Sequence, residues 1–266
     1  MLRIITLNLN GVRSASTKGV LPWIAAQSAD FVCVQELKAQ EKDLQPEMKH
    51  PGGMAGHFFP SERPGYSGVG LYSRHPVDRI ETDLGGGALS EEFASEGRYL
   101  AVDVGPITVV SLYVPSGSSS EERQQAKFRF LDHFFYRLSE LYASGREVVV
   151  CADWNIAPTQ RDLKNWKSNQ KNSGFLPKER DWIAKVQREI GFVDVYRQLH
   201  PEATDACYTW WSNRGQAWAK NVGWRLDYQL ATPGIAKTAR SATVYKDQRF
   251  SDHAPLTIDY DFEVTP

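Results

Sequence analysis

The chain of 266 residues has few cysteines, no long apolar run and a formal net charge of only −1. Its three cysteines are odd in number, and their spacings match no zinc motif. Cys33 and Cys151 lie in apolar, strand-like segments, so we expect buried, reduced thiols. No segment approaches the roughly 20 apolar residues of a membrane span, and the first residues lack signal-peptide character. We therefore expect a cytoplasmic protein without a membrane anchor.

The near-zero charge is not that of a typical nucleic-acid-binding protein, which often has a pI above about 9. The charge is nevertheless uneven along the chain. Between residues 161 and 188 eight lysines and arginines stand against three acidic residues. Such a segment favours either a solvated surface or a local face that binds phosphates, and its composition alone does not decide between them.

Strand-like segments dominate the chain, and no Pro-, Ser- or Gly-rich linker divides it, so we expect a single domain over residues 1–266. Predicted strands lie near residues 2–9, 31–35, 68–73, 99–103, 107–114, 147–152, 225–231, 242–245 and 254–260. Helices are predicted near residues 20–28, 119–145 and 178–190, the second opening with a capping box of Ser119 and Glu122. This pattern predicts two stacked sheets with helices outside.

Polar residues stand where several of the predicted strands end. They are Asn8, Gln35, Glu36, Tyr113, Asp153, Asn155, Asp227, Asp252 and His253. Loops at strand ends display reactive groups on a rigid scaffold. Taken singly, each of these residues is more often a turn, cap or surface residue than a catalyst. The complete set favours a functional site.

The chemistry of this set favours a hard divalent cation. Carboxylate and amide oxygens suit Mg²⁺ or Mn²⁺, and Glu36 is the first candidate ligand. A histidine paired with an aspartate stays protonated and binds an anionic phosphate. A carboxylate beside an amide orients a water molecule for attack. Together these groups are what hydrolysis of a phosphodiester needs.

Six segments carry a resemblance to a known family. They are Asn8-Leu-Asn-Gly-Val-Arg13, Val34-Gln-Glu-Leu-Lys38, Tyr113-Val-Pro-Ser-Gly117, Ala152-Asp-Trp-Asn155, Asn221-Val-Gly-Trp-Arg-Leu-Asp-Tyr228 and Ser251-Asp-His-Ala-Pro255. In this order they resemble the exonuclease III family of apurinic/apyrimidinic endonucleases, over nearly the whole chain from residue 2 to about 260. The segment 221–228 is the most discriminating, because the wider superfamily usually lacks it.

The resemblance implies a four-layer α/β sandwich, in which two packed mixed β-sheets are flanked by helices. It also implies a metal site for Mg²⁺ or Mn²⁺ on Glu36, helped by Asn8 and, as an open alternative, by Asp252. Asp153 and Asn155 are included in this expected metal site. The implied partner is double-stranded DNA with abasic sites or damaged 3′ ends, bound by a monomer.

The resemblance further implies a role for each polar residue. Asp153 aligns or deprotonates the attacking water, and Asn155 holds that water or the phosphate. His253, paired with either Asp227 or Asp252, contacts a non-bridging phosphate oxygen. Cleavage in such enzymes is 5′ to the abasic site and leaves a 3′-hydroxyl. Side activities as a 3′–5′ exonuclease and a 3′-phosphatase or phosphodiesterase are expected.

Substrate contacts are implied by the same resemblance. Tyr113 stabilises the scissile phosphate or the leaving group. The expected DNA-binding residues are Trp210, Trp224 and Leu226 in an apolar sugar pocket, Ser173 and Gly174 in a minor-groove loop, and Arg13 and Lys38. An abasic nucleotide is easily extruded because little stacking is lost. Without the resemblance, the same tryptophans are equally well explained as core residues.

Two positions depart from the family pattern. Ala152 stands where many relatives have glycine. Alanine is costly there if the position needs a positive φ. Ser116 stands where relatives often have asparagine or glutamine. Because the serine side chain is shorter, we expect one phosphate contact to be shortened or bridged by water. Neither departure removes a catalytic group.

Three alternatives remain open from the sequence. The first is an enzyme that acts mainly as a 3′–5′ exonuclease and 3′-phosphatase, with little abasic-site cleavage. The second is a phosphomonoesterase or lipid phosphodiesterase of the same superfamily, although no apolar membrane-facing segment supports it. The third is a non-catalytic DNA-binding protein, which the intact set of polar residues argues against. The sequence does not determine the balance of activities, the preferred metal or the number of metal ions.

Overall fold

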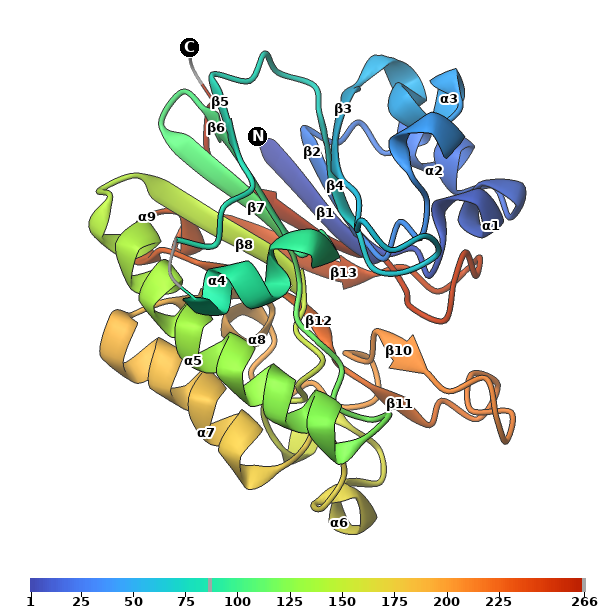
Figure 1. Cartoon of the computed structure of the whole chain (residues 1–266), viewed down its shortest axis with the longest axis vertical. Coiled ribbons are helices and arrows are strands. Elements are labelled where there is room, and N and C mark those ends of the chain that lie inside the picture. Colours follow the sequence, from blue (N-terminus) through green and yellow to red (C-terminus); the bar gives the residue numbers. More distant parts are fainter. Residues whose placement is uncertain (86–87, 265–266) are drawn as a thin grey trace.

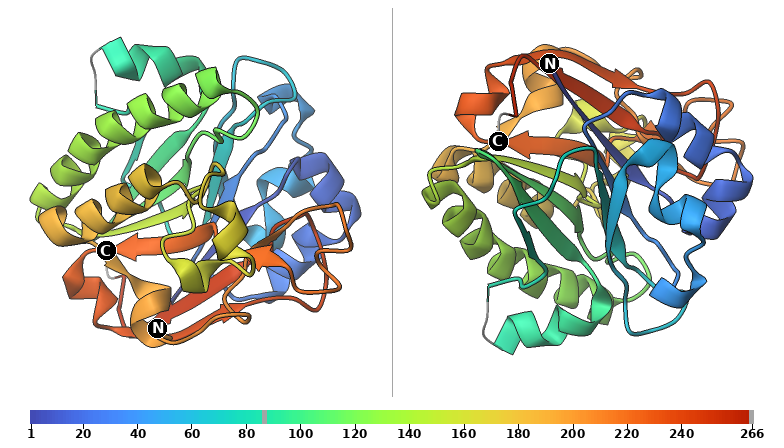
Figure 2. Two further views of the ribbon diagram at one scale, coloured as in Figure 1. Left: turned by 90° about the horizontal axis from the view of Figure 1, so that it is seen from below. Right: turned by 90° about the horizontal axis from the view of Figure 1, so that it is seen from above.

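The computed structural model describes residues 1–85 and 88–264. In these residues two six-stranded sheets lie face to face, and helices cover the outer face of each sheet (Figure 1). Seen from above and below, the chain forms a helical layer, two sheets and a second helical layer (Figure 2). The four-layer α/β sandwich predicted from the sequence is therefore confirmed.

The first sheet has the strand order β13-β14-β1-β2-β4-β3. Its strands are β1 (Leu2–Asn8), β2 (Phe31–Gln35), β3 (Ala55–Phe59), β4 (Val69–Ser73), β13 (Ala239–Val244) and β14 (Leu256–Tyr260). The pair β1 and β2 is parallel, and the other neighbours are antiparallel. Both strands of the parallel pair consequently end at the same edge of the sheet.

The second sheet repeats this plan, with the order β5-β6-β7-β8-β12-β9. Its strands are β5 (Arg79–Glu81), β6 (Tyr99–Val104), β7 (Ile107–Tyr113), β8 (Glu147–Asp153), β9 (Val193–Asp194) and β12 (Asp227–Ala231). Here β7 and β8 form the parallel pair. A separate antiparallel ribbon joins β10 (Trp210–Trp211) to β11 (Gly223–Trp224).

The alternating direction of side chains along each strand divides the apolar residues between two cores. In β1, Ile4 packs between the sheets, whereas Ile5 and Leu7 pack against the outer helices. In β2, Cys33 faces inward and Val34 faces outward. Because successive side chains of a strand point to opposite faces, the parity of a position decides which core it joins. All three cysteines are free and buried, which confirms the prediction made for Cys33 and Cys151.

The helices are short, with one exception. They are α1 (Val12–Thr17), α2 (Val20–Ala26), α3 (Pro46–Lys49), α4 (Ala88–Phe93), α5 (Glu121–Ala143), α6 (Trp166–Asn169), α7 (Pro177–Lys185), α8 (Val195–Leu199) and α9 (Pro233–Ala236). A π-helical turn, Val186–Ile190, extends α7. Among the described residues, no helix combines the length and the apolar content needed to cross a membrane.

The long helix α5 lies along the outer face of the second sheet (Figure 1). Its N-cap is Ser120, whose hydroxyl accepts a hydrogen bond from the Arg123 backbone N–H at 3.2 Å. The capping box predicted for Ser119 and Glu122 is therefore wrong: the cap is one residue later, and the residue three positions after it is Arg123, which forms no such box. The polar run that precedes the helix contains three consecutive serines, and local sequence does not distinguish which one caps it.

We expect Phe134→Ala to lower the free energy of unfolding by about 3–5 kcal/mol, because it leaves a cavity. Phe134 of α5 is fully buried and lies against the rings of Phe130, Tyr99 and Trp154. Denaturant unfolding measures the change. The matched control is Tyr136→Ala on the same helix, where the ring is 70% exposed and the change should stay within about 0.5 kcal/mol. Equal losses in both variants would contradict the assigned packing.

Candidate active site

The polar residues predicted as a site lie at one open edge of the space between the two sheets. Parity places Asn8 on the inner face at the end of β1, and Asp153 on the inner face at the end of β8. These two ends meet across the sandwich, where the Asn8 Nδ2 donates to Asp153 Oδ2 at 2.8 Å. Residues 145 positions apart are thus brought together by strand alternation and sheet packing.

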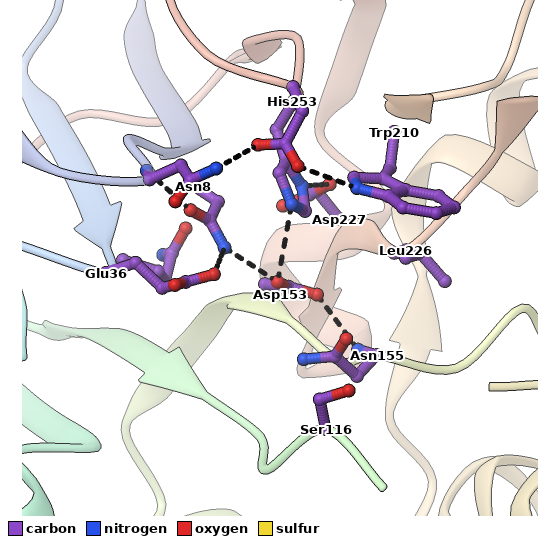
Figure 3. Close-up of polar contacts among 12 residues, drawn as sticks. Asn8, Glu36, Ser116, Asp153, Asn155, Trp210, Leu226, Asp227 and His253 are labelled. Atoms are coloured by element: carbon purple, nitrogen blue, oxygen red, sulfur yellow. Dashed lines mark hydrogen bonds and ion pairs between the residues drawn. The ribbon is translucent and has the colours of Figure 1, made fainter. Parts of the chain in front are cut away.

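Glu36 completes the first group of polar contacts. It follows β2, and its Oε1 accepts a hydrogen bond from the same Asn8 amide at 2.8 Å (Figure 3). Glu36 has a φ of 52°, in the left-handed region. The backbone N–H of Gly11 donates to the Glu36 carbonyl at 2.8 Å and so holds this turn beside the end of β1. One amide therefore orients two carboxylates that come from different sheets.

Candidate metal-binding atoms of Glu36, Asp153 and His253 lie within 4.8 Å of one another. Lys38 Nζ lies 2.7 Å from Glu36 Oε2, so this carboxylate already contacts a cationic group. Two carboxylates beside an amide fit a hard divalent cation. His253 is the weaker member of this group, because a protonated imidazole has no free lone pair for a metal.

His253 is held by Asp227. Its Nδ1 lies 2.8 Å from Asp227 Oδ2, which also accepts the Thr209 hydroxyl at 2.7 Å. Burial alone would lower the imidazole pKa, but the charges of Asp227 and Asp153 raise the pKa of His253 to about 10. His253 Nε2 lies 3.8 Å from Asp153 Oδ2. The histidine is therefore a buried cation at neutral pH that faces the carboxylate of Asp153.

Asp153, the last residue of β8, and Asn155 form a turn at the end of this strand. The Asn155 backbone N–H donates to Asp153 Oδ1 at 2.9 Å, and the Asn155 Nδ2 donates to the Val114 carbonyl at 2.9 Å. Asn155 has a φ of 50°. Burial and the negative charges of Asp227 and Glu36 raise the pKa of Asp153, while the His253 charge opposes the rise. Asp153 is thus a carboxylate poised to exchange a proton near neutral pH.

Tyr113 ends β7 on the same inner face and is nearly fully buried. Burial and the charges of Glu36 and Asp153 raise the pKa of Tyr113 far above its usual value, so its phenol keeps its proton. The Arg98 guanidinium lies over the Tyr113 ring at 4.9 Å and donates to the Tyr113 carbonyl at 3.1 Å. A fixed phenol O–H donor results.

A cavity of about 760 Å³ opens from these groups. Beyond the polar end it is lined by Trp210, Trp224 and Leu226, and by Ser173 and Gly174, of which Gly174 lies beside the Trp224 ring. The two tryptophan rings meet edge to face with centroids 6.3 Å apart. The pocket therefore joins a charged end to an apolar end.

Most of the predicted site residues line this cavity. They are Glu36, Tyr113, Asp153, Asn155, Ser173, Gly174, Trp210, Trp224, Leu226, Asp252 and His253. Asn8 and Asp227 lie behind them, fully buried, and orient them. Lys38 and Arg13 are not part of the cavity wall; Lys38 contacts Glu36, and Arg13 is exposed on α1.

Asp252 is not the partner of His253, an alternative left open by the sequence. Its Oδ1 accepts the Asn10 amide at 2.8 Å and its Oδ2 accepts the Trp210 indole N–H at 3.1 Å. Burial opposes the effect, but the His253 charge and these two hydrogen bonds lower the pKa of Asp252. Asp252 therefore fixes the indole of Trp210 at the junction of the polar and apolar ends.

Three orienting residues were not identified from the sequence. The Thr209 hydroxyl accepts hydrogen bonds from the Leu226 and Asp227 backbone N–H groups and donates one to the Asp227 carboxylate. Arg98 supports Tyr113, and Asn10 links Asp252 to Lys38. Only Asn10 carried a usable signal, because it stands two residues after Asn8 in the same segment. Thr209 and Arg98 act through contacts that no local pattern reveals.

The two departures from the family pattern have simple structural outcomes. Ala152 lies within β8 and is not among the residues with positive φ, so alanine carries no backbone strain there. Ser116 lines the cavity, and its hydroxyl lies 3.0 Å from the Ser118 hydroxyl. Its predicted role in phosphate binding stays a prediction.

Comparison with known proteins agrees with this geometry. Residues 5–253 match the model of the Endonuclease/Exonuclease/phosphatase family. The chain is 31% identical to an exodeoxyribonuclease of Bacillus subtilis, over 97% of this chain and 98% of that protein. It is 32% identical to the DNA repair nuclease APEX1 of Danio rerio, over 97% of this chain and 81% of that protein.

A solved structure is similar throughout. The AP endonuclease of Archaeoglobus fulgidus matches with a TM-score of 0.86 and 28% identity, over 98% of this chain and all of that chain. The fold and the site together define a phosphoester hydrolase with a two-sheet α/β-sandwich fold. The chain belongs to the Endonuclease/Exonuclease/phosphatase family, and its nuclease relatives confirm the resemblance noted in the sequence.

We expect Asp227→Asn to lower the pKa of His253 from about 10 by roughly one to three pH units, because an opposite charge at hydrogen-bond distance is lost. The raised pKa means that the pair stabilises the fold fully below about pH 6.5, the usual histidine value, and that this contribution is lost as the pH rises through 10. NMR titration of the imidazole measures the shift. An unchanged titration would show that Asp227 is not the dominant partner.

Proposed function

We propose that this protein hydrolyses the DNA backbone 5′ to abasic sites and leaves a 3′-hydroxyl, with 3′–5′ exonuclease and 3′-phosphatase or phosphodiesterase side activities. The observation that carries the proposal is the convergence of Glu36, Asp153 and His253 at the charged end of a cavity whose other end is apolar. Its nuclease relatives support a DNA substrate. We further propose a single-domain, cytoplasmic monomer.

Glu36 and Asp153 would hold Mg²⁺ or Mn²⁺, with Asn8, Asn155 and Asp252 as further candidate ligands. Asn8 Oδ1 already accepts the Asn10 backbone N–H, so ligation through this atom uses its second lone pair. The bound cation would supply Lewis-acid polarisation of a phosphate oxygen and neutralise developing charge. Lys38 now contacts Glu36. When Glu36 binds a cation instead, the Lys38 ammonium would be free to contact the phosphate.

The chain's own groups divide the remaining chemistry. Asp153, with its raised pKa, accepts a proton from the attacking water, and Asn155 orients that water or the phosphate. The His253 imidazolium, fixed by Asp227, donates to a non-bridging oxygen. Tyr113 donates its phenol proton in a hydrogen bond to the phosphate or the leaving oxygen. Tyr113 at the end of β7, the turn of Asp153 and Asn155 at the end of β8, and His253 before β14 would meet the phosphate from three strand ends.

The apolar end of the cavity accepts the extruded sugar. Trp210, Trp224 and Leu226 exclude water from the sugar, while the small residues Ser173 and Gly174 leave room in the same cavity. Extrusion is easier for a nucleotide without a base, because less stacking is lost. Arg13, exposed on α1, is proposed to contact the DNA backbone outside the cavity. The partner is double-stranded DNA with abasic sites or damaged 3′ ends.

The basic segment 161–188 contributes less to DNA binding than its composition suggests. Arg161 pairs with Glu202 and Lys164 with Asp205, each at 2.7 Å. Lys171 instead lines the cavity. Only part of this segment is therefore available to phosphates, and the proposed DNA face centres on the cavity.

The decisive experiment compares rates on an internal abasic duplex, a 3′-recessed duplex and a 3′-phosphate nick. We expect the abasic duplex to be cut fastest. The alternative, an enzyme that acts mainly as a 3′–5′ exonuclease and 3′-phosphatase, predicts the reverse order. A complete lack of abasic cleavage beside rapid 3′-end removal would establish that alternative.

Metal removal should abolish nicking of the abasic duplex, and Mg²⁺ or Mn²⁺ should restore it. Glu36→Gln should lower kcat by about 100-fold or more, because a charged ligand beside the reacting phosphate is lost. Gel assays of nicking with and without EDTA measure both effects. The matched control is Glu47→Gln, an exposed glutamate outside the cavity, which should retain full activity. Undiminished nicking in EDTA would sink the proposed metal dependence.

Ser173→Phe should depress abasic cleavage more than 3′-phosphate removal. The larger ring would fill the side of the cavity where the sugar lies, while the charged end stays open. Steady-state rates on the two substrates give the ratio. Ser168→Phe, on exposed α6 and away from the cavity wall, is the matched control. Equal losses on both substrates in Ser173→Phe would count against the assigned position of the sugar.

A further inference from the structure

A lysine and a glutamate are completely buried between α5 and α7, behind the cavity. Lys127 Nζ lies 2.6 Å from Glu179 Oε1, and neither side chain has any exposed surface. A buried ion pair loses much of its electrostatic gain to desolvation, and apolar residues of similar size often stabilise a fold as well or better. Stability alone therefore does not account for this pair, and its other contacts give it a further role.

Glu179 anchors the loop that forms one wall of the cavity. Its Oε2 accepts the backbone N–H groups of Gly174 at 2.7 Å and Leu176 at 2.9 Å. Its Oε1 accepts the Lys127 ammonium and the Gln124 amide. All four bonds converge on one carboxylate, so the path of the loop depends on this side chain.

Lys127 reaches the other side of the same wall. Its Nζ donates to the Asn155 carbonyl at 2.7 Å. Asn155 has left-handed backbone angles, and a partner that fixes its carbonyl stabilises this conformation. The ion pair thus connects the turn that carries Asp153 and Asn155 with the loop that carries Gly174.

The two connected segments touch directly. Gly174 has a φ of 93°, and a Cβ there would lie 3.2 Å from the Asn155 carbonyl oxygen and 3.3 Å from the Trp224 ring. No side chain fits between loop, turn and ring without displacement. A shift of this loop relative to Asn155 would therefore change the width of the apolar end of the cavity.

We propose that Lys127 and Glu179 are positioning residues that set the spacing between the water-orienting turn and the sugar-side loop, and thereby the preference for an internal abasic site over a 3′ end. This inference rests on the proposed function. An internal abasic sugar has to be accommodated at the apolar end of the cavity, which Gly174 and Trp224 both line, whereas a terminal phosphate needs only the charged end. Loosening the loop should consequently affect the two substrates unequally.

Glu179→Gln tests the loop anchor. A neutral amide holds two backbone N–H groups and a lysine less well than a carboxylate. We expect kcat/KM on the internal abasic duplex to fall about tenfold or more, since small misplacements near a reacting group are costly. The rate on a 3′-phosphate nick should change by less than about threefold, because this substrate needs only the charged end, where no reacting group is misplaced. Similar losses on both substrates would overturn the inference.

The double variant Lys127→Met with Glu179→Gln removes both charges and leaves no buried ion unpaired. It also removes the contact with the Asn155 carbonyl, so both substrates should now be cut more slowly. Glu147→Gln is the matched control, because Glu147 likewise accepts a backbone N–H, from Ile235, and a hydroxyl, from Thr232, but at the opposite end of β8. Its substrate ratio should equal that of the unaltered protein.

Amide hydrogen exchange tests the anchor without catalysis and without any variant. In the unaltered protein the Gly174 and Leu176 amides should be strongly protected, although their loop lies beside an open cavity. Glu179→Gln should speed their exchange selectively. Free exchange of both amides in the unaltered protein would overturn the inference. Failure of the proposed function shows itself differently, as a lack of abasic nicking by the unaltered protein.

Discussion

The hydrogen bonds from one side-chain amide to two carboxylates hold this site together. Asn8 donates from the first sheet to Asp153 of the second sheet and to Glu36 beside it. Two like charges would otherwise separate or take up protons. Because the amide is itself fully buried at the end of a central strand, the two sheets cannot shift against each other without breaking these bonds. The same hydrogen bonds therefore fix both the packing of the two sheets and the geometry of the site.

Backbone strain marks the same edge of the sandwich. Asn10, Glu36 and Asn155 all have positive φ although none is glycine. Each such residue costs of order 1–3 kcal/mol and persists only where the surroundings enforce it. Here the enforcement is visible, because the Gly11 N–H holds the Glu36 carbonyl and Lys127 holds the Asn155 carbonyl. Of these three residues, Glu36 and Asn155 line the cavity, and Asn10 binds Asp252 of the cavity wall.

Much of this arrangement was predictable from the sequence, and the reasons for the rest are physical. The central strands were found because they are long and apolar, whereas β9, β10 and β11 have two residues each and give no periodic signal. The convergence of strand-end residues followed from the resemblance. The choice between Asp227 and Asp252 as the partner of His253 did not, because it depends on Trp210 and Asn10 occupying Asp252. Hydrogen bonds between distant loops leave no local pattern.

The charge balance of the site gives the cation a second role beside that of a ligand. Burial and the negative charges of Asp227 and Glu36 raise the pKa of Asp153, although the His253 imidazolium opposes the rise. A divalent cation next to Glu36 would oppose that rise and favour the ionised form of Asp153. The ionised form of Asp153, which takes a proton from water, would then be more populated at neutral pH when the cation is present. Metal binding and general-base catalysis are thus linked by electrostatics, even if a single carboxylate did all of the coordination.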